Sequence, residues 1–215
     1  MRESILFIHS TCGIIIFILG ILQATLPKRG ISHKVMGRMY VILWFPLIIT
    51  GGYLGSWILL ALGGLGLYSA VTGWRYAKSK KQLFSPLDKA IVFIGAIMVL
   101  TLVSGAIYLF TIDSVDFAII TAVFSFIFGM FIQVDLREVV FGKSIRRRST
   151  HKMYWLFEHY GRMYISMIAA FSAFSAIQQP FPNQLVNWLW PTAIGTVALI
   201  ILGQHYNKKF NIGKK

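Results

Sequence analysis

The residues of this chain that could do chemistry are predicted to gather at one end of its helices. Asp135 follows a strongly apolar run, and an ionisable group at that depth in a membrane tends to face the bundle and to have a partner. Arg38 and Arg162 are predicted at a matching depth and are the expected partners. Glu158 precedes Arg162 by four residues, a spacing that favours an ion pair along one helix. Two interpretations stay open: salt bridges that hold the bundle together, or a site that responds to a proton or a metal.

Three histidines are predicted at the same end as Asp135. His33, His159 and His205 could carry protons, bind a metal or, in pairs from different helices, bind a haem b. His9 is predicted near the opposite end, about 25 Å of helix away, and cannot share a haem with the other three. The predicted ligand or proton site therefore comprises Asp135, His159, His205, His33, Arg38, Arg162 and Glu158.

One tetrapeptide, GRMY, occurs at 37–40 and again at 161–164. Ser32-His33-Lys34 precedes the first copy, and Thr150-His151-Lys152 precedes the second copy at a longer spacing. Each copy is predicted to lead from a capping Ser or Thr into a helix of the same direction, with the second His-Lys pair further from the membrane because six more residues are helical. This repeated motif predicts two parallel three-helix repeats that are joined by one inverting helix. In such a 3+1+3 arrangement a binding site lies between the two halves.

Lys34 and Lys152 are predicted near the N-terminal ends of these two helices. Cations there oppose the helix dipole, so helix stability does not explain them. They are explained by membrane topology and contact with lipid headgroups, or by a specific anion at the free backbone N–H groups.

The elements that position these residues are membrane-spanning helices. Of the 215 residues, 56% are hydrophobic and 13% are charged, whereas about a quarter of the residues of a soluble domain are charged. We predict an all-α, seven-helix bundle that forms a single transmembrane domain over 1–215, with a hairpin at Gly51 and Gly52 between the second and third helices. The predicted helices are approximately 5–26, 35–50, 53–74, 90–112, 117–141, 155–179 and 185–205.

The placement of positive charge predicts the orientation of these helices. With the N-terminus outside, every Lys and Arg except Arg2 falls on the inner side, as the positive-inside rule requires. We therefore predict an N-out, C-in protein of the bacterial cytoplasmic membrane, whose inner loops contact anionic lipid headgroups. Nucleic acid is not an expected partner, because the basic residues lie in short loops between the spans.

Sequence signatures of common enzyme classes are absent from the chain. It contains no HExxH, CxxC or Walker motif and no visible nucleophile with its base. The leading prediction is transport or ligand binding through a cytosol-facing polar site, without enzymatic activity. A haem b electron-transfer protein or oxidoreductase, and a structural or assembly protein of the membrane, remain alternatives.

Several stretches resemble a family of uncharacterised bacterial multi-pass proteins with a predicted membrane domain of unknown function. They are HKxxGRMY at 33–40, GLGLYSAVTGWRYAK at 64–78 and WLFEHYGRMYISMIAAFSAF at 155–174, with His9 in the first helix. The resemblance covers most of the chain and implies no activity. It implies that a recurring pattern includes His9, His33, Arg38, Tyr40, His159 and 168–174.

Overall fold

The computed structural model describes residues 1–26, 30–55, 57–80, 85–142 and 151–210. Within these ranges the chain forms seven α-helices and no strand, which confirms the predicted all-α, seven-helix architecture. The helices are α1 (Arg2–Thr25), α2 (Gly30–Leu54), α3 (Trp57–Ser79), α4 (Pro86–Thr111), α5 (Val115–Phe141), α6 (Tyr154–Gln178) and α7 (Gln184–Lys209).

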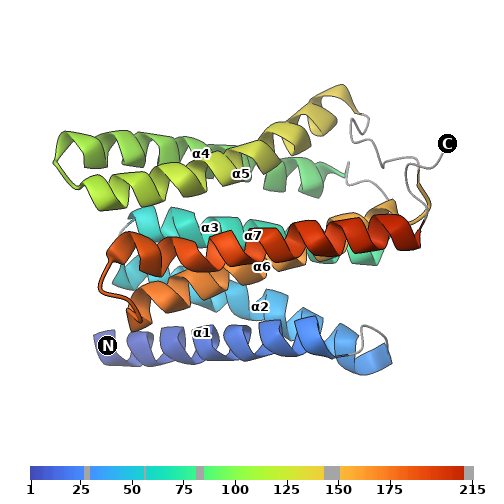
Figure 1. Cartoon of the computed structure of the whole chain (residues 1–215), viewed down its shortest axis with the longest axis horizontal. Helices are drawn as coiled ribbons and strands as arrows, with labels where there is room; N and C mark the ends of the chain where they lie inside the picture. The colour runs from blue at the N-terminus through green and yellow to red at the C-terminus, as the bar shows by residue number, and fades with distance from the viewer. Residues whose placement is uncertain (27–29, 56, 81–84, 143–150, 211–215) are drawn as a thin grey trace.

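The helices lie side by side along the long axis of the molecule (Figure 1). The pair α1–α2 and the pair α4–α5 flank a central group made of α3, α6 and α7 (Figure 1). The helix α3 contacts α2, α4, α5 and α6, and α6 contacts α1, α3 and α7. The centre of the bundle is therefore the pair α3–α6.

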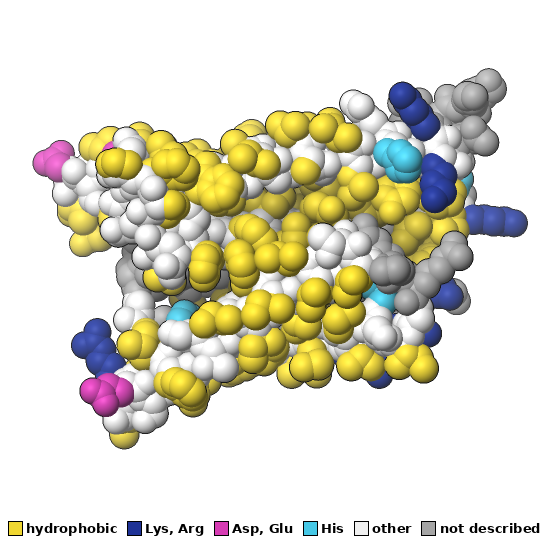
Figure 2. Space-filling view, turned by 60° about the horizontal axis from the view of Figure 1, so that its bottom comes forward, with side chains coloured by type: hydrophobic (Ala, Val, Ile, Leu, Met, Phe, Trp, Pro, Cys, Tyr) yellow, Lys and Arg dark blue, Asp and Glu magenta, His cyan; other side chains and the backbone are white. Residues whose placement is uncertain are grey.

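Five helices, α1, α2, α4, α5 and α7, are long and apolar enough to cross a membrane. Large apolar side chains are exposed along them, as on α4 at Phe93, Ile97, Leu100 and Ile107. Apolar side chains also cover much of the middle of the surface in Figure 2. Such a surface is stable in lipid and costly in water, which indicates a membrane protein.

The remaining helices, α3 and α6, have 23 and 25 residues and are similar in length to the five apolar helices. Their sequences hold more polar residues, including Thr72 and Arg75 in α3 and Glu158 and Arg162 in α6. Because these two helices pack against one another and against their neighbours, their polar side chains can face protein instead of lipid.

Charge divides the two ends of the bundle. In the face drawn in Figure 2, Lys and Arg side chains gather at one end, and acidic side chains lie at the other end beside a basic one. Part of the positive charge behind the predicted asymmetry lies outside the described residues, at 27–29, 81–84, 143–150 and 211–215.

The predicted hairpin between the second and third helices lies further along the chain than expected. Helix α2 continues through Gly51 and Gly52 to Leu54, and the amide of Gly55 still donates to the carbonyl of Gly51 at 2.8 Å. A methyl group on Gly51 would lie 3.1 Å from the His9 ring of α1. This glycine therefore permits close helix packing and does not break the helix.

The contacts give the predicted 3+1+3 repeat no support. In the first triplet α2 contacts both α1 and α3, whereas in the second triplet α7 contacts both α5 and α6. Among the described residues, α5 and α6 share no backbone contact. The two GRMY copies also differ in context, because His33 and Lys34 lie inside α2 while His151 and Lys152 form a turn before α6. Thr150 lies outside the described residues.

Candidate functional site

A buried ion pair joins α5 to α6. The Arg162 guanidinium donates to both oxygens of the Asp135 carboxylate, from Nη1 at 2.9 Å and from Nη2 at 2.7 Å. The residues are 3% and 5% exposed, respectively. A two-bond pair of this kind fixes both the distance and the orientation of its partners. Of the two arginines predicted as partners of Asp135, the structure selects Arg162, while Arg38 is exposed on α2.

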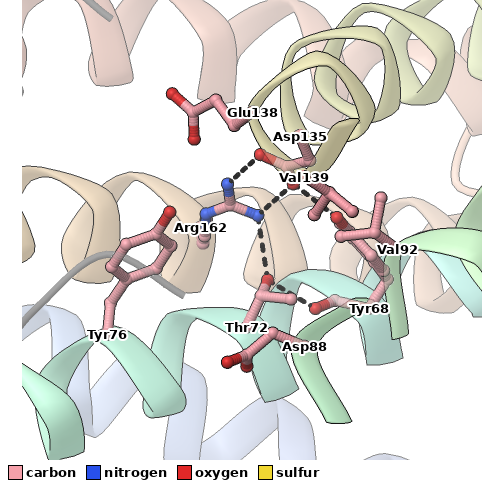
Figure 3. A pocket seen from close by; sticks show the side chains of 9 residues that line it. All are labelled: Tyr68, Thr72, Tyr76, Asp88, Val92, Asp135, Glu138, Val139 and Arg162. Carbon is pink, nitrogen blue, oxygen red and sulfur yellow. Dashed lines mark hydrogen bonds and ion pairs between the residues drawn. The ribbon is translucent and has the colours of Figure 1, made fainter. Parts of the chain in front are cut away.

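Helix α3 completes the pair with two hydroxyl groups. The Tyr68 hydroxyl donates to Asp135 Oδ2, and Arg162 Nη1 donates to Thr72 Oγ1 at 3.0 Å (Figure 3). The Thr72 hydroxyl in turn donates to the Tyr68 backbone carbonyl at 2.7 Å. We refer to Tyr68, Thr72, Asp135 and Arg162 as the polar network, which links three helices.

Two further side chains surround the guanidinium of Arg162. Its Nε donates to Glu158 Oε2 at 3.2 Å along α6, in the predicted i, i+4 pair. The ring of Tyr76 lies 5.1 Å from the guanidinium carbon, within the range of a cation–π contact. Arg162 is thus held by partners from α3, α5 and its own helix.

The polar network borders a small cavity of about 20 Å³, enough for roughly one water molecule. Its walls combine hydroxyl, carboxyl and guanidinium groups with two valines (Figure 3). The residues that line it are Tyr68, Thr72, Tyr76, Asp88, Val92, Asp135, Glu138, Val139 and Arg162. The space is large enough for one water molecule that bridges two of the polar groups around it.

Asp88 combines a structural role with its place on the cavity wall. It lies in the first turn of α4, where it forms a capping box with Ser85, and it pairs with Arg75 of α3. Sequence reasoning did not single out Asp88, although Ser85-Pro86 followed by an acid is a typical helix start.

Four of the seven acidic residues of the chain converge on this region. Asp88, Asp135 and Glu138 line the cavity, and Glu158 contacts Arg162. Asp88, Asp135 and Glu138 are each less than 6% exposed. Acids are rare in this basic chain, so their concentration at one buried place separates this region from the rest of the bundle.

The predicted histidines are divided between two locations. His159 Nδ1 is 2.9 Å from the Gly73 carbonyl of α3, and its ring lies edge-on to the ring of His33 with centroids 6.3 Å apart. His205 is exposed on α7, where its ring contacts Tyr206. The described residues contain no group of three His, Cys, Asp or Glu side chains placed to hold a metal.

The other predicted residues lie outside the polar network. His9 Nδ1 lies 3.0 Å from Thr50 Oγ1 and 3.2 Å from the Leu47 carbonyl, which ties α1 to α2. The Tyr40 hydroxyl is 2.9 Å from Ser166 Oγ and ties α2 to α6. Lys34 and Lys152 are exposed.

Sequence reasoning missed Tyr68, Thr72 and Glu138. A signal for the first two was present, because Tyr68, Thr72 and Tyr76 follow one another at i, i+4 spacing and so share one face of α3. Glu138 follows Asp135 by three residues, which places both acids on one face of α5.

Comparison of the chain with protein families, with curated protein sequences and with solved structures finds no match. The geometry of the site therefore carries the functional argument. The resemblance to a membrane family of unknown function stays a prediction from the sequence.

The buried pair makes a testable contribution to stability. Replacing Asp135 by Leu leaves the Arg162 charge buried without its carboxylate, which should lower the free energy of unfolding by about 3–5 kcal/mol. The double variant Asp135→Leu, Arg162→Met removes both charges and should recover most of that loss. Denaturant unfolding in detergent, followed by circular dichroism, measures both effects. Asp116→Asn, at an exposed position of α5, serves as the neutral control, and a double variant as unstable as the single one would contradict the assignment.

Proposed function

We propose that this protein is a membrane transport protein in which the polar network binds and releases a proton as a ligand moves, and in which protons also cross alone when no ligand is present. The observation that carries this proposal is the Asp135–Arg162 pair beside a water-sized cavity that is also lined by Glu138 and Asp88. Ionisable groups inside a membrane bundle typically mark ion pathways and proton relays.

The chemistry of these groups supports a proton site. Carboxylates that share a low-dielectric region repel one another, so binding a proton or a cation lowers the energy of the group. Among the described residues, Asp135, Glu138, Asp88 and Glu158 bring four carboxyl groups together near Arg162 and Arg75. A proton bound at Asp135 would weaken its two bonds to Arg162 and free that pair to rearrange.

Proton movement tests this function directly. In vesicles that enclose a pH-sensitive dye, a potassium diffusion potential should drive protons inward faster with the protein than without it. Asp135→Asn should reduce the protein-dependent rate about a hundredfold, the lower part of the range for a positioned proton-transfer group. Tyr68→Phe, which removes the hydroxyl donor to Asp135, should give a smaller reduction in a protein that keeps its ion pair.

Asp116→Asn is the matched control for this experiment, because it makes the same chemical change at the exposed start of α5. It should leave the proton flux unchanged. Equal flux in the unmodified protein, Asp135→Asn and Tyr68→Phe, each with normal helix content, would reject the polar network as the proton site.

We further propose that all seven helices cross a bacterial cytoplasmic membrane with the N-terminus outside and the C-terminus inside. Every Lys and Arg except Arg2 then faces the cytoplasm, and the basic end of the bundle contacts anionic lipid headgroups. This orientation places the polar network near the cytoplasmic side. Nucleic acid is not part of the proposal.

Cysteine labelling tests the orientation. A membrane-impermeant thiol reagent should react from outside with Ser114→Cys, between α4 and α5, and should reach Lys209→Cys only after the membrane is permeabilised. The natural Cys12 is buried in α1 and gives the background. The reverse pattern of labelling would invert the proposed topology.

Haem-dependent electron transfer is the second candidate function. The observation in its favour is the proximity of His33 and His159, which come from α2 and α6 and whose ring centroids are 6.3 Å apart. With His159 Nδ1 engaged by the Gly73 carbonyl, Nε2 is the atom that would face iron. This candidate predicts a Soret absorption band in the purified protein and its loss in His159→Ala, and protein made with ample haem but lacking the band would reject it.

A further inference from the structure

A second and larger cavity lies between α5, α6 and α7, with Leu65 of α3 as part of its wall. Its volume is about 350 Å³, within the range of about 300–1,000 Å³ that is typical of small-molecule sites. The cavity exists because α5 and α6 do not pack on one another in the described structure, while α7 contacts both. Most of its lining is apolar and includes Phe124, Phe131, Ile165, Ile168 and Leu199.

Polar groups lie at the two ends of this cavity. Glu158 lines the end nearest the polar network and is 17% exposed, although its partner Arg162 is 3% exposed. Thr192 lines the other end, where its hydroxyl is 3.1 Å from Ser172 Oγ. From Glu158 to Ala169, the two ends of the α6 lining, the helix axis rises by about 16 Å, so the cavity is elongated along the helices.

The cavity reaches the surface that would face lipid. Met130 of α5 and Thr196 of α7 line it and are also exposed, Met130 by 56%. Large apolar side chains are exposed nearby on the same helices, at Phe126 of α5 and Ile200 of α7. A molecule dissolved in the bilayer could therefore enter from the side without crossing water.

We propose that this cavity binds a long-chain amphiphile from the bilayer, with its chain among the apolar side chains and a cationic or hydrogen-bond-donating head at Glu158. The length, the apolar lining and the single carboxylate at one end all fit this shape. The role of this amphiphile as the transported ligand rests on the transport function proposed above. Its binding is a separate property and is tested separately.

The charge of the head follows from the groups at that end. The Arg162 guanidinium already donates to Asp135, Thr72 and Glu158. Because its donors are occupied, it does not favour binding of an anionic head group. A carboxylate can accept up to about four hydrogen bonds, so Glu158 can serve Arg162 and a ligand together. An amine or ammonium head therefore fits better than a carboxylate head, which Glu158 would repel.

Photo-crosslinking tests the proposal with a defined probe, a long-chain alkylamine that carries a diazirine at the far end of its chain. In vesicles that contain the protein, irradiation should label the lining of the outer part of the cavity, around Phe124, Ile168 and Thr192. An excess of unlabelled alkylamine should remove this labelling. The same excess of unlabelled alkylamine should not change the non-specific labelling of the exposed face of α4, for example at Leu100.

Two matched substitutions test where the alkyl chain of the amphiphile binds. Ala169→Phe fills the cavity and should abolish the competed labelling, whereas Ala198→Phe places the same ring on the exposed side of α7 and should leave it intact. A fatty acid probe of the same chain length should give little competed labelling at neutral pH, and Glu158→Gln should reduce the preference for the amine. Competed labelling that survives Ala169→Phe in a folded protein, or that is stronger with the fatty acid, would overturn the proposal.

Asp135→Asn separates this inference from the proton function. The substitution should reduce proton flux about a hundredfold. Competed labelling should still occur at saturating probe, with a changed affinity only, because Asp135 does not line the larger cavity but shares Arg162 with Glu158. If the unmodified protein moves no protons but is labelled as expected, the proton function fails and the amphiphile site stands. Proton flux without competed labelling rejects the amphiphile site alone.

Discussion

Burial of the Arg162 guanidinium is the constraint on which the rest of the structure depends. A charge that is taken out of water must be paired and hydrogen-bonded, or the fold loses several kcal/mol. Arg162 meets this demand through Asp135, Thr72 and Glu158, with the Tyr76 ring alongside. These partners come from α3, α5 and α6, so one side chain fixes how three helices sit relative to one another.

This constraint also explains why hydropathy differs among the helices. The donors and acceptors around Arg162 can be satisfied only where protein excludes lipid, which places α3 and α6 at the centre of the bundle. The helices α1, α2, α4, α5 and α7 can then be apolar enough to cross a membrane. Because α5 is tied to α6 through Asp135 and Arg162 and not through direct helix packing, space for the larger cavity remains between them.

Much of this could be predicted from the sequence, for identifiable reasons. Apolar runs and turns predicted seven helices, and the depth of Asp135 predicted an arginine partner. Depth alone could not distinguish Arg162 from Arg38, because that choice depends on which face of each helix turns inward. Gly51 and Gly52 suggested a helix break, but the space they leave is filled by the rings and side chains of other helices. The repeated GRMY motif predicted a repeat that the contacts do not support, because four identical residues do not determine how two helices pack.

Glu158 links the larger cavity to the polar network through Arg162, which gives the two proposed sites a means of coupling. One of its oxygens accepts from Arg162, and the same side chain lines the end of the larger cavity. A cationic head that shares the Glu158 carboxylate would weaken the hydrogen bond from Arg162 to Glu158, while a proton at Asp135 would weaken the bonds from the same guanidinium to Asp135. Each event changes the hold on Arg162, so ligand and proton need no contact with one another to influence each other's binding. The buried guanidinium that holds the bundle together is thereby also the group through which the two sites can be coupled.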